Sequence, residues 1–419
     1  MEYITEPARR ARITNTCDVL VAGGGVAGIA AALAAARGGA SVILLEREYT
    51  LGGMATLGLV TIYLPLDDGA GRQVVFGIGE ELLKLSIAHG AEANYPSAWL
   101  DGGTLDERVK NRYVTQFNPH LFALRAEKLL TDAGVTILYG TLAAGAVKRE
   151  DAITHIITEN KSGRGAIAVK SVIDCTGDAD VCALAGAKTV KHAKGNALAS
   201  WYYYYSKGAV ALKMFGLADV VPDGGGGLAA AVPDDTSYDN EMVESLDNGF
   251  RFSGVDGAEL SRAVIAAHQR MYGDIAGARG ADDTYVPVTI SSIPLVRMSR
   301  RLAGVSTPDV DGDRRFVPDS IGMTGDWRRR GPVFEVPFGA LYSSDIKNLL
   351  AAGRAISVTD ALWDVTRVIP PCAVTGEAAG TAAALYIDKE DCDGFASLDI
   401  AELQNKLISQ GVAIHYERT

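Results

Sequence analysis

The chain has 419 residues, of which 48% are hydrophobic and 22% are charged, and its formal net charge is −11. It is long enough for two domains, or for one domain with a large insertion, and its composition is that of a globular protein. The acidic balance argues against nucleic acid or an anionic membrane as the main partner.

The N-terminus and the cysteines indicate the compartment. Residues 1–16 contain no apolar run, so they do not have the pattern of a signal peptide. The five cysteines are scattered, odd in number and without a CxxC pair. This argues against a disulfide framework, a zinc site and a dithiol redox motif. We therefore expect a soluble cytoplasmic protein that holds no metal.

The stretch Asp18–Glu46 predicts a strand, a tight turn, a helix and a second strand. An apolar run comes first, then glycines in the spacing GxGxxG, an alanine-rich segment, and a β-branched run that ends at Glu46. In such a unit the glycines permit a tight turn, approach of the backbone to a pyrophosphate and close helix packing, and an acid about 20 residues later binds a ribose. Six glycines and Arg37 argue against the alternative, a transmembrane helix. The stretch indicates a dinucleotide site.

The residues after Glu46 indicate which dinucleotide is bound. Arg47 follows the acid, and Leu51–Thr56 reads LGGMAT, with a second glycine pair. A loop of small residues is useful where a broad flat ring lies against the backbone. This arrangement resembles the large family of FAD-dependent oxidoreductases of the two-dinucleotide-binding type, in which an ER…GGMAT segment lies along the pyrophosphate and the flavin ring. Non-covalent FAD is expected, because no histidine or cysteine follows the glycine pair in the usual attachment context.

The following segment leaves this pattern and then returns to it. Over 60–117 an amphipathic helix and a polar excursion are expected, which the resemblance places in the roof over the substrate. Asn118 and Pro119 fit the cap and the first turn of a new helix. A strand and a β-meander follow, and the meander returns to a buried strand that ends near Asp174.

Asp174–Asp180 reads DCTGDAD and matches a second signature of the family. A strand that ends in Thr-Gly brings backbone close to a ligand at the carboxyl edge of a sheet. We expect Thr176 and Gly177 near FAD, and Asp178 to act at least partly as a helix cap. Cys175 is expected to be a small strand residue and not a redox group.

Residues 190–290 carry fewer signals. Trp201–Tyr205 is an aromatic run that, as a strand, would alternate between two faces, with packing favoured over direct ligand contact. Gly224–Gly227 is expected to be a flexible loop and a candidate lid, and Glu259–Arg270 a helix.

The C-terminal third matches the family again. Residues 294–304 read PLVRMSRRLAG, and Asn348–Arg354 is an apolar strand that ends in Gly-Arg. Arg367–Cys372 reads RVIPPC and opens a helix over Ala373–Tyr386, rich in small residues that allow close approach to another element. The resemblance implies that the positive end of this helix faces the pyrimidine edge of the flavin. There, helped by Arg367, it would favour the negative charge that the ring gains on reduction.

The resemblance implies an α/β fold, with a Rossmann-like (glutathione-reductase-like) FAD-binding domain and a discontinuous α+β cap or substrate domain. The FAD-binding domain is expected over 14–60, 118–190 and 336–390, the cap or substrate domain over 61–117 and 191–335, and a C-terminal helical tail over 391–419. The residues placed at FAD are Gly23, Gly24, Gly25, Val26, Ala27, Gly28, Glu46, Arg47, Gly52, Gly53, Met54, Ala55, Val147, Thr176, Gly177, Gly353, Arg354, Arg367, Val368 and Cys372.

Substrate contacts are expected from aromatic and cationic side chains. A tryptophan beside cations binds acidic or polyhydroxylated molecules by stacking and bidentate hydrogen bonds, which favours Trp327, Arg328 and Trp363. Tyr63 is the fourth substrate candidate. For Arg328 a solvated basic loop is an equally good interpretation.

The catalytic candidates are Arg367, Glu335 and Asp364. Glu335 has apolar neighbours in the sequence, which would raise its pKa and suit it to acid–base work. Burial against an arginine is the alternative for Glu335. None of the six histidines lies in a recognisable catalytic arrangement.

The resemblance implies an enzyme that moves a hydride between flavin N5 and a small polar substrate, with oxidation of an alcohol, sugar or hydroxy acid favoured. Reduction of an activated C=C bond is the alternative. Two non-redox classes share the fold: tRNA-modification proteins, against which the acidic charge argues, and thiazole-synthase-type enzymes, whose Cys/His arrangement is not found. No second GxGxxG for NAD(P)H is recognisable, so a soluble electron donor or acceptor stays open, as does a homo-oligomer.

Overall fold

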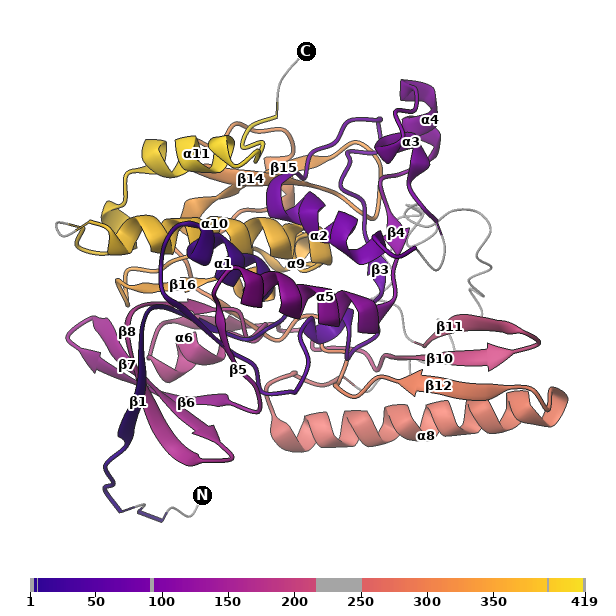
Figure 1. Ribbon diagram of the computed structural model, residues 1–419, viewed down its shortest axis with the longest axis horizontal. Helices are drawn as coiled ribbons and strands as arrows, with labels where there is room; N and C mark the ends of the chain where they lie inside the picture. Colours follow the sequence, from indigo (N-terminus) through magenta and orange to yellow (C-terminus); the bar gives the residue numbers. More distant parts are fainter. Residues whose placement is uncertain (1–3, 6, 91–93, 216–250, 390–391, 417–419) are drawn as a thin grey trace.

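The computed structural model describes residues 4–5, 7–90, 94–215, 251–389 and 392–416. At its centre is a seven-stranded sheet (Figure 1). Its strands are β1 (Arg12–Ala22), β2 (Val42–Leu45), β5 (Thr136–Leu138), β6 (Leu142–Arg149), β7 (Ala152–Asn160), β8 (Gly163–Asp174) and β16 (Leu349–Ala351). The predicted loop Gly224–Gly227 lies outside the described residues.

The parallel part of this sheet has the order β5-β2-β1-β8-β16. Val19–Ala22, the predicted strand, is fully buried, and β1 begins earlier because its exposed first half also pairs with β8. β6, β7 and β8 form the predicted antiparallel meander. The predicted α/β, Rossmann-like fold is confirmed. Since parallel strands end at the same edge, the glycine loops that follow β1, β2, β8 and β16 meet there.

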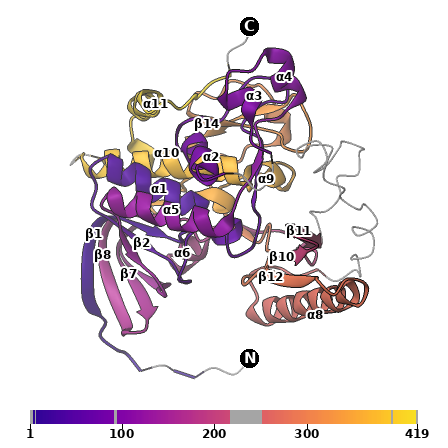
Figure 2. The ribbon, with the colours of Figure 1, turned by 45° about the vertical axis from the view of Figure 1, so that its right-hand side comes forward.

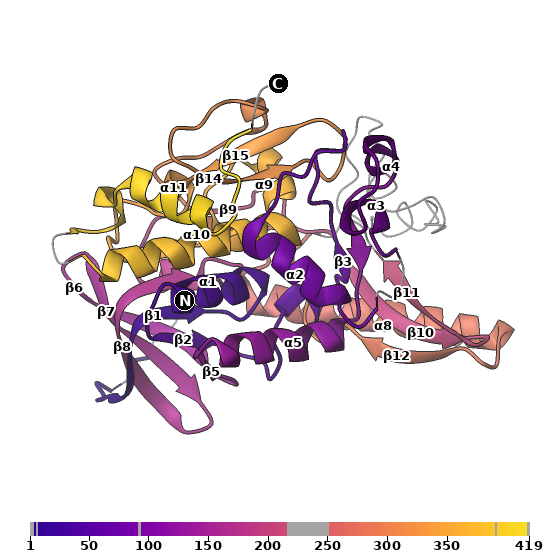
Figure 3. The same cartoon turned by 45° about the horizontal axis from the view of Figure 1, so that its top comes forward.

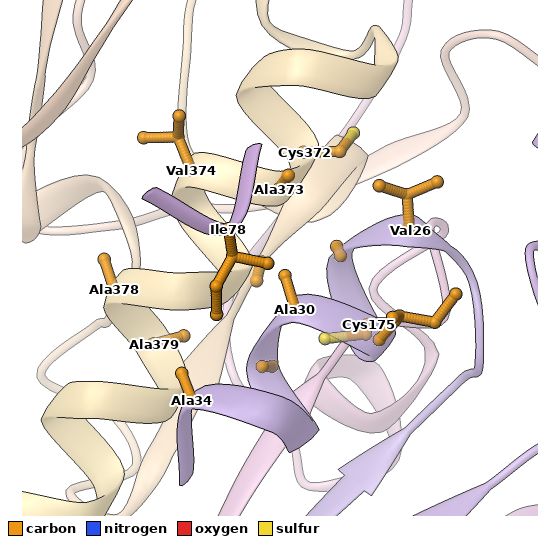
Figure 4. Packing of buried hydrophobic residues seen from close by; sticks show 14 of the residues in the cluster. Val26, Ala30, Ala34, Ile78, Cys175, Cys372, Ala373, Val374, Ala378 and Ala379 are labelled. Atoms are coloured by element: carbon orange, nitrogen blue, oxygen red, sulfur yellow. The ribbon is translucent and has the colours of Figure 1, made fainter. Parts of the chain in front are cut away.

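Helices α1 (Val26–Arg37) and α10 (Ile369–Ile387) lie side by side on one face of the sheet, and α2 (Gly77–Ile87) and α5 (Pro119–Asp132) lie next to them (Figures 1 and 3). A Cβ at Gly376 would be 2.2 Å from the carbonyl oxygen of Ala27, and one at Gly380 2.2 Å from that of Ala31. Only glycine allows so close an approach of two backbones. The small residues predicted on the C-terminal helix thus serve its contact with α1, where alanines of both helices meet (Figure 4).

A second, three-stranded sheet has the order β11 (Ala209–Phe215), β10 (Ser200–Ser206), β12 (Val286–Ile290), and helix α8 (Gly257–Ala281) packs against it (Figure 2). α8 is longer than the predicted helix. In the aromatic run, Tyr202 packs with Met271 of α8, whereas Trp201 and Tyr203 pack with Leu59. Both faces of β10 are therefore packed.

Smaller elements complete the described part. Short strand pairs are β9 (Thr189–Lys191) with β13 (Arg300–Leu302), β14 (Ser320–Gly325) with β15 (Val333–Pro337), and β3 (Ile62–Tyr63) with β4 (Thr115–Gln116). The remaining helices are α3 (Ser97–Leu100), α4 (Leu105–Lys110), α6 (Asp180–Leu184), α9 (Asp360–Thr366) and α11 (Ile400–Ser409), and single 3-10 turns are η1 (Gly53–Ala55), η3 (Val310–Gly312), η4 (Phe338–Ala340), η5 (Gly353–Ala355) and η6 (Phe395–Ser397). α11 contacts α10 and β14. No helix in the described ranges is both long and apolar enough to cross a bilayer.

Glu377 is a buried carboxylate on α10 that holds the start of α2. Its Oε2 accepts a hydrogen bond from the N–H of Ile78 at 2.8 Å. Burial raises the pKa of Glu377 to about 7 from an ordinary value of 4.5. The folded state therefore prefers the protonated acid. This contribution to stability is fully present below the ordinary pKa and is lost as the pH rises through about 7.

We predict that Glu377→Gln removes this pH dependence, because glutamine keeps the acceptor for Ile78 but does not ionise. Near pH 8 the variant should exceed the wild type in free energy of unfolding by up to about 3 kcal/mol, and near pH 4 the two should be similar. Denaturant unfolding at both pH values measures the difference. A difference that does not change with pH would contradict the prediction.

Candidate functional site

A cavity of about 670 Å³ lies at the carboxyl edge of the parallel strands. One wall is the nucleotide unit that the glycine motifs predict, and the other is built by α8 and the segment after β12. The residues assigned to FAD that line it are Gly23, Gly25, Val26, Ala27, Glu46, Arg47, Gly52, Gly53, Met54, Ala55, Thr176, Gly177, Gly353, Arg354, Arg367 and Cys372.

The three motif glycines have different roles. A Cβ at Gly28 would be 1.8 Å from the carbonyl oxygen of Gly23, so glycine is needed there for α1 to pack against the turn. Gly23 has φ of +102°, and a Cβ would be 2.5 Å from the carbonyl oxygen of Cys175. At Gly25 the backbone is extended and a Cβ would meet nothing within 4 Å. Because Gly25 lines the cavity, a side chain here would occupy ligand space at the start of α1, where phosphates bind.

Glu46 is fixed at the edge of the cavity by two backbone amides. Its Oε2 accepts a hydrogen bond from the N–H of Gly24, and its Oε1 one from the N–H of Glu48, each at 2.8 Å. Burial raises the pKa of Glu46, and these two hydrogen bonds oppose the rise. A carboxylate held in this way keeps lone pairs for the hydroxyls of a ribose. Gly24 orients Glu46 and does not itself line the cavity.

The loop with the second glycine pair, Gly52 and Gly53, is hydrogen-bonded to the glycine turn after β1. The N–H of Gly52 donates to the carbonyl oxygen of Gly24 at 2.8 Å. Gly52 and Gly53 both have positive φ, +103° and +53°, so the loop turns sharply into η1. This turn presents Met54 and Ala55 to the cavity. The loop predicted to lie along a flat ring thus forms part of the cavity wall.

Asp174 organises the end of β8. Its carboxylate accepts hydrogen bonds from the N–H and the hydroxyl of Thr176 and from the N–H of Cys182. These bonds close the turn from β8 into α6 and place Thr176 and Gly177 against the cavity. Cys175 lies directly after β8 and not in the strand, contrary to the expectation. Burial raises its pKa strongly, so it stays a thiol.

Asp178 does not cap α6, contrary to the sequence-based expectation. The N-cap is Ala179, which makes no side-chain hydrogen bond. The carboxylate of Asp178 instead accepts a hydrogen bond from the hydroxyl of Ser299 and lies 3.4 Å from a guanidinium nitrogen of Arg354. Asp178 thus joins β8 to two segments that are distant in the sequence, which its local sequence pattern does not reveal.

Asp180 also lines the cavity, beside Asp178. Burial and the nearby carboxylates of Asp178 and Asp174 raise the pKa of Asp180 to about 6, although Arg300 pairs with it at 2.7 Å. This acid was not among the predicted site residues.

Helix α10 begins at the cavity, where Ile369 and Cys372 line the wall. Its N-cap, Val368, makes no side-chain hydrogen bond, but Pro370 and Pro371 carry no N–H. The helix end therefore acts on a ligand through its dipole and the single N–H of Ile369. Burial raises the pKa of Cys372 to about 12, so this residue is a thiol and not a nucleophilic thiolate.

The arginines of the cavity are paired with carboxylates. In addition to its carboxylate partner, Arg354 donates a hydrogen bond to the carbonyl oxygen of Val296 at 2.7 Å. No unpaired arginine remains among the described residues that line the cavity. The pairs are Arg47 with Glu48, Arg354 with Asp178 and Arg367 with Asp364.

Glu335 lies outside the lining of the cavity, in β15. Its Oε2 accepts a hydrogen bond from the N–H of Val317 at 2.8 Å and lies 2.9 Å from Nδ1 of His415, and its Oε1 accepts one from the N–H of Tyr416 at 2.9 Å. All of these partners are structural. Glu335 therefore holds the C-terminal segment to β15, and its predicted acid–base role stays a prediction.

The aromatic residues predicted to contact the substrate are buried, and they form hydrogen bonds to the backbone of other segments. The indole N–H of Trp363 donates to the carbonyl oxygen of Arg354 at 2.8 Å, and that of Trp327 to the carbonyl oxygen of Asp364 at 2.9 Å. The hydroxyl of Tyr63 donates to the carbonyl oxygen of a residue in α2. None of the three lines the cavity. Trp363 and Trp327 instead position the backbones that carry Arg354 and Asp364.

Arg328 is also engaged within the protein. Its guanidinium pairs with the buried carboxylate of Asp326 at 2.9 Å and lies 3.7 Å from that of Asp364. Its side chain is only 15% exposed, so it does not belong to a solvated loop. Asp364, in turn, bridges Arg328 and Arg367.

Four residues assigned to FAD do not line the cavity: Gly24 and Gly28, whose roles are described above, and Val147 and Val368. Two segments of the wall, in α8 and after β12, were not among the assigned residues. Val147 is 44% exposed on β6, and the cavity reaches only the start of that strand, at 141–143. Val368 caps α10 without lining the cavity. In the segment after β12, Pro294 and Val296 come from the family-like run 294–304, which was not assigned to the site from the sequence. The residues of α8 carry no such motif.

The sequence profile described as FAD dependent oxidoreductase matches residues 18–273 and 314–407, most of the chain. The protein belongs to this family and is an FAD-dependent oxidoreductase. No curated protein matches it. Among solved structures, a geranylgeranyl bacteriochlorophyll reductase-like protein of Thermoplasma acidophilum aligns with a TM-score of 0.46 and 15% identity, over 95% of this chain and 84% of that one. The p-nitrophenol 4-monooxygenase of Pseudomonas putida aligns with 0.44 and 13%, over 95% and 89%.

We predict that Gly25→Val abolishes FAD binding while the apoprotein keeps its stability. A Cβ at this position has no protein atom within 4 Å, so the fold has room for the start of the side chain, which extends into the space beside the start of α1 where phosphates bind. FAD titration by fluorescence quenching and thermal unfolding of the apoprotein measure the two properties. Gly273→Val, on α8, is the matched control, because a Cβ there is also unobstructed. A Gly25→Val variant with unchanged FAD affinity would contradict the site.

We predict that Glu335→Gln lowers the stability and leaves the pH profile of flavin reduction unchanged. Glutamine offers one acceptor where the carboxylate serves Val317, His415 and Tyr416, so a loss of about 1–3 kcal/mol is expected. Thermal unfolding and the rate of flavin reduction between about pH 5 and 9 are the measurements. A shifted pH profile would restore Glu335 as an acid–base residue.

Proposed function

We propose that the protein oxidises a small hydroxyl-bearing molecule (an alcohol, a sugar or a hydroxy acid) by transferring a hydride to flavin N5 of FAD. The observation that supports this most is the start of α10 at the cavity, next to Arg367. A helix dipole and a guanidinium at this point favour negative charge, which a flavin ring gains when it is reduced and not when it serves only as a structural ligand.

Bound FAD supplies a two-electron acceptor. Gly25 and the start of α1 would hold its pyrophosphate, and Glu46 the ribose. Met54 and Gly353 would lie against the ring. Each of these residues lines the cavity.

The Arg367–Asp364 pair would set the reduction potential of the flavin. Arg367 brings positive charge to the cavity, whereas Asp364, hydrogen-bonded to its guanidinium, offsets part of it. Trp327 holds the backbone of Asp364, so this balance is built into the fold.

We also propose a cytoplasmic setting and a soluble electron acceptor. The setting is supported by the five free cysteines, four of them buried, since disulfides form mainly in oxidising compartments. For the acceptor, the sequence lacks a second GxGxxG for NAD(P)H.

We predict opposite shifts of the flavin reduction potential for Arg367→Ala and Asp364→Asn. Loss of the guanidinium should lower the potential by about 30 mV and slow reduction, and loss of the carboxylate should raise it, since about 1.4 kcal/mol corresponds to 30 mV for two electrons. Dye-equilibrated photometric titration measures both. FAD should stay bound in both variants. Shifts of the same sign would show that the two side chains act by distortion and not by charge.

The proposed reaction is tested by the visible spectrum of the protein under anaerobic conditions. Flavin bands that bleach on addition of an alcohol, a sugar or a hydroxy acid support it. Bands that bleach with dithionite or NAD(P)H but with none of these compounds would overturn it in favour of a reductase.

A further inference from the structure

The cavity wall across from the nucleotide unit is mostly apolar, although Ser261 of α8 also lines it. It is formed by α8 and the segment after β12, which lie in a separate layer beside the large sheet (Figures 1 and 2). The apolar side chains that it presents are Leu260, Val264, Ile265, Ile293, Pro294 and Val296.

Leu260 and Val296 also pack with Phe252 and Ala263 in the core of their own layer. The side chains that are given mainly to the cavity are therefore Val264, Ile265 and Ile293. The buried residues of α8 are Ala263, Ala267 and Met271, which lie on a different face of the helix from Ile265. Ile265 is 56% exposed although it lines the cavity. Apolar side chains left uncovered at the edge of a cavity indicate a surface that an apolar ligand covers.

Hydrogen bonds attach this wall to the segments expected at the flavin ring. The N–H of Ser292 donates to the carbonyl oxygen of Leu57 at 2.9 Å, and the N–H of Leu57 donates to that of Gly53 at 2.8 Å. On the other side, Arg354 donates to the carbonyl oxygen of Val296 at 2.7 Å. The segment after β12 is therefore anchored to Leu57 and Arg354, which line the same cavity. Val264 of α8 lies near this segment, because it lines a second, smaller cavity together with Ile293 and Pro294.

The charges around the cavity do not favour an acidic substrate. Arg354 and Arg367, the arginines at the ring end, are each paired with a carboxylate and are part of the protein's own hydrogen-bond network. Arg328, predicted to bind an anion, pairs with Asp326 and lies outside the lining. A substrate carboxylate would therefore have to share a guanidinium that Asp178 or Asp364 already neutralises, which weakens its attraction.

We propose that the substrate is an uncharged alcohol with an apolar body, which lies against Val264 and Ile265 while its carbinol carbon faces the flavin. This inference rests on the proposed function and narrows its substrate class from alcohols, sugars and hydroxy acids to apolar alcohols. The C–H bond of the carbinol carbon breaks and its hydride reduces FAD. The hydroxyl proton passes to solvent at the open edge of the cavity as the C=O bond forms. The half-reaction is complete with one FAD per alcohol.

The test compares two classes of alcohol on the FAD-loaded protein. Under anaerobic conditions, the secondary alcohols 2-butanol, 2-hexanol and 2-octanol, together with lactate and glucose, are added and the flavin bands are followed. Each CH₂ that is buried should lower the half-saturating concentration about fourfold. Lactate or glucose as the better reductant would overturn the apolar class and leave the proposed oxidation standing. Bleaching by dithionite alone would overturn both.

Variants of the wall give a readout independent of turnover. Val264→Thr replaces a methyl group by a hydroxyl of similar size, and Val288→Thr, at an exposed position of β12, is the matched control. Binding of 2-octanone, the expected product of 2-octanol, is measured by its perturbation of the oxidised flavin spectrum. The dissociation constant should rise several-fold for Val264→Thr and stay unchanged for the control, with normal FAD content in both. Equal affinities in the two variants would overturn the assignment of the wall.

Discussion

The close contact of three backbones, those of the β1 turn, α1 and α10, determines where the site lies. Gly28 lets α1 meet the turn, and Gly376 and Gly380 let α10 meet α1 at distances that a Cβ would not permit. Both helices then begin at one cavity, on the carboxyl edge of the parallel strands. Their positive ends face the same volume, one at the expected phosphate position and one at the expected ring position.

This geometry explains how an acidic protein holds an anionic cofactor. The chain has a net charge of −11, and the arginines that line its cavity are paired with carboxylates. Positive potential in the cavity therefore comes mainly from helix ends and backbone amides, which cost no additional charge. The internal pairing of the arginines also leaves the ring end without a free cation, and the facing wall of α8 is apolar. These features support the proposal that an uncharged substrate binds beside the anionic cofactor.

The parts of the site that the sequence predicted are those defined by local geometry. The spacing of Gly23, Gly25 and Gly28 and the acid at Glu46 describe one continuous unit, and the structure places its parts around one cavity. The small residues of α10 predicted its close approach to another element for the same reason, because a helix needs such residues only where another backbone comes close. The fold class followed from these units and from the meander.

The remaining residues depend on contacts between distant segments. Glu335 has apolar neighbours in the sequence, which suggested a raised pKa, but its partners are at 317 and 415–416. Trp363 is next to Asp364 in the sequence. Its indole N–H, however, donates to the carbonyl oxygen of Arg354, and the side chain does not line the cavity. The α8 wall consists of ordinary leucine, valine and isoleucine, whose side of the helix is settled only by what the helix packs against.

The flavin content of the purified protein tests the cofactor site most directly. The protein is loaded with FAD, freed of excess by gel filtration, and precipitated with acid, and the flavin in the supernatant is measured. We expect one FAD per chain, all of it in the supernatant, because burial raises the pKa of Cys175 and Cys372, the cysteines that line the cavity, and keeps them as thiols. Protein that retains no flavin after loading would contradict the site, and flavin that stays in the precipitate would contradict its non-covalent character.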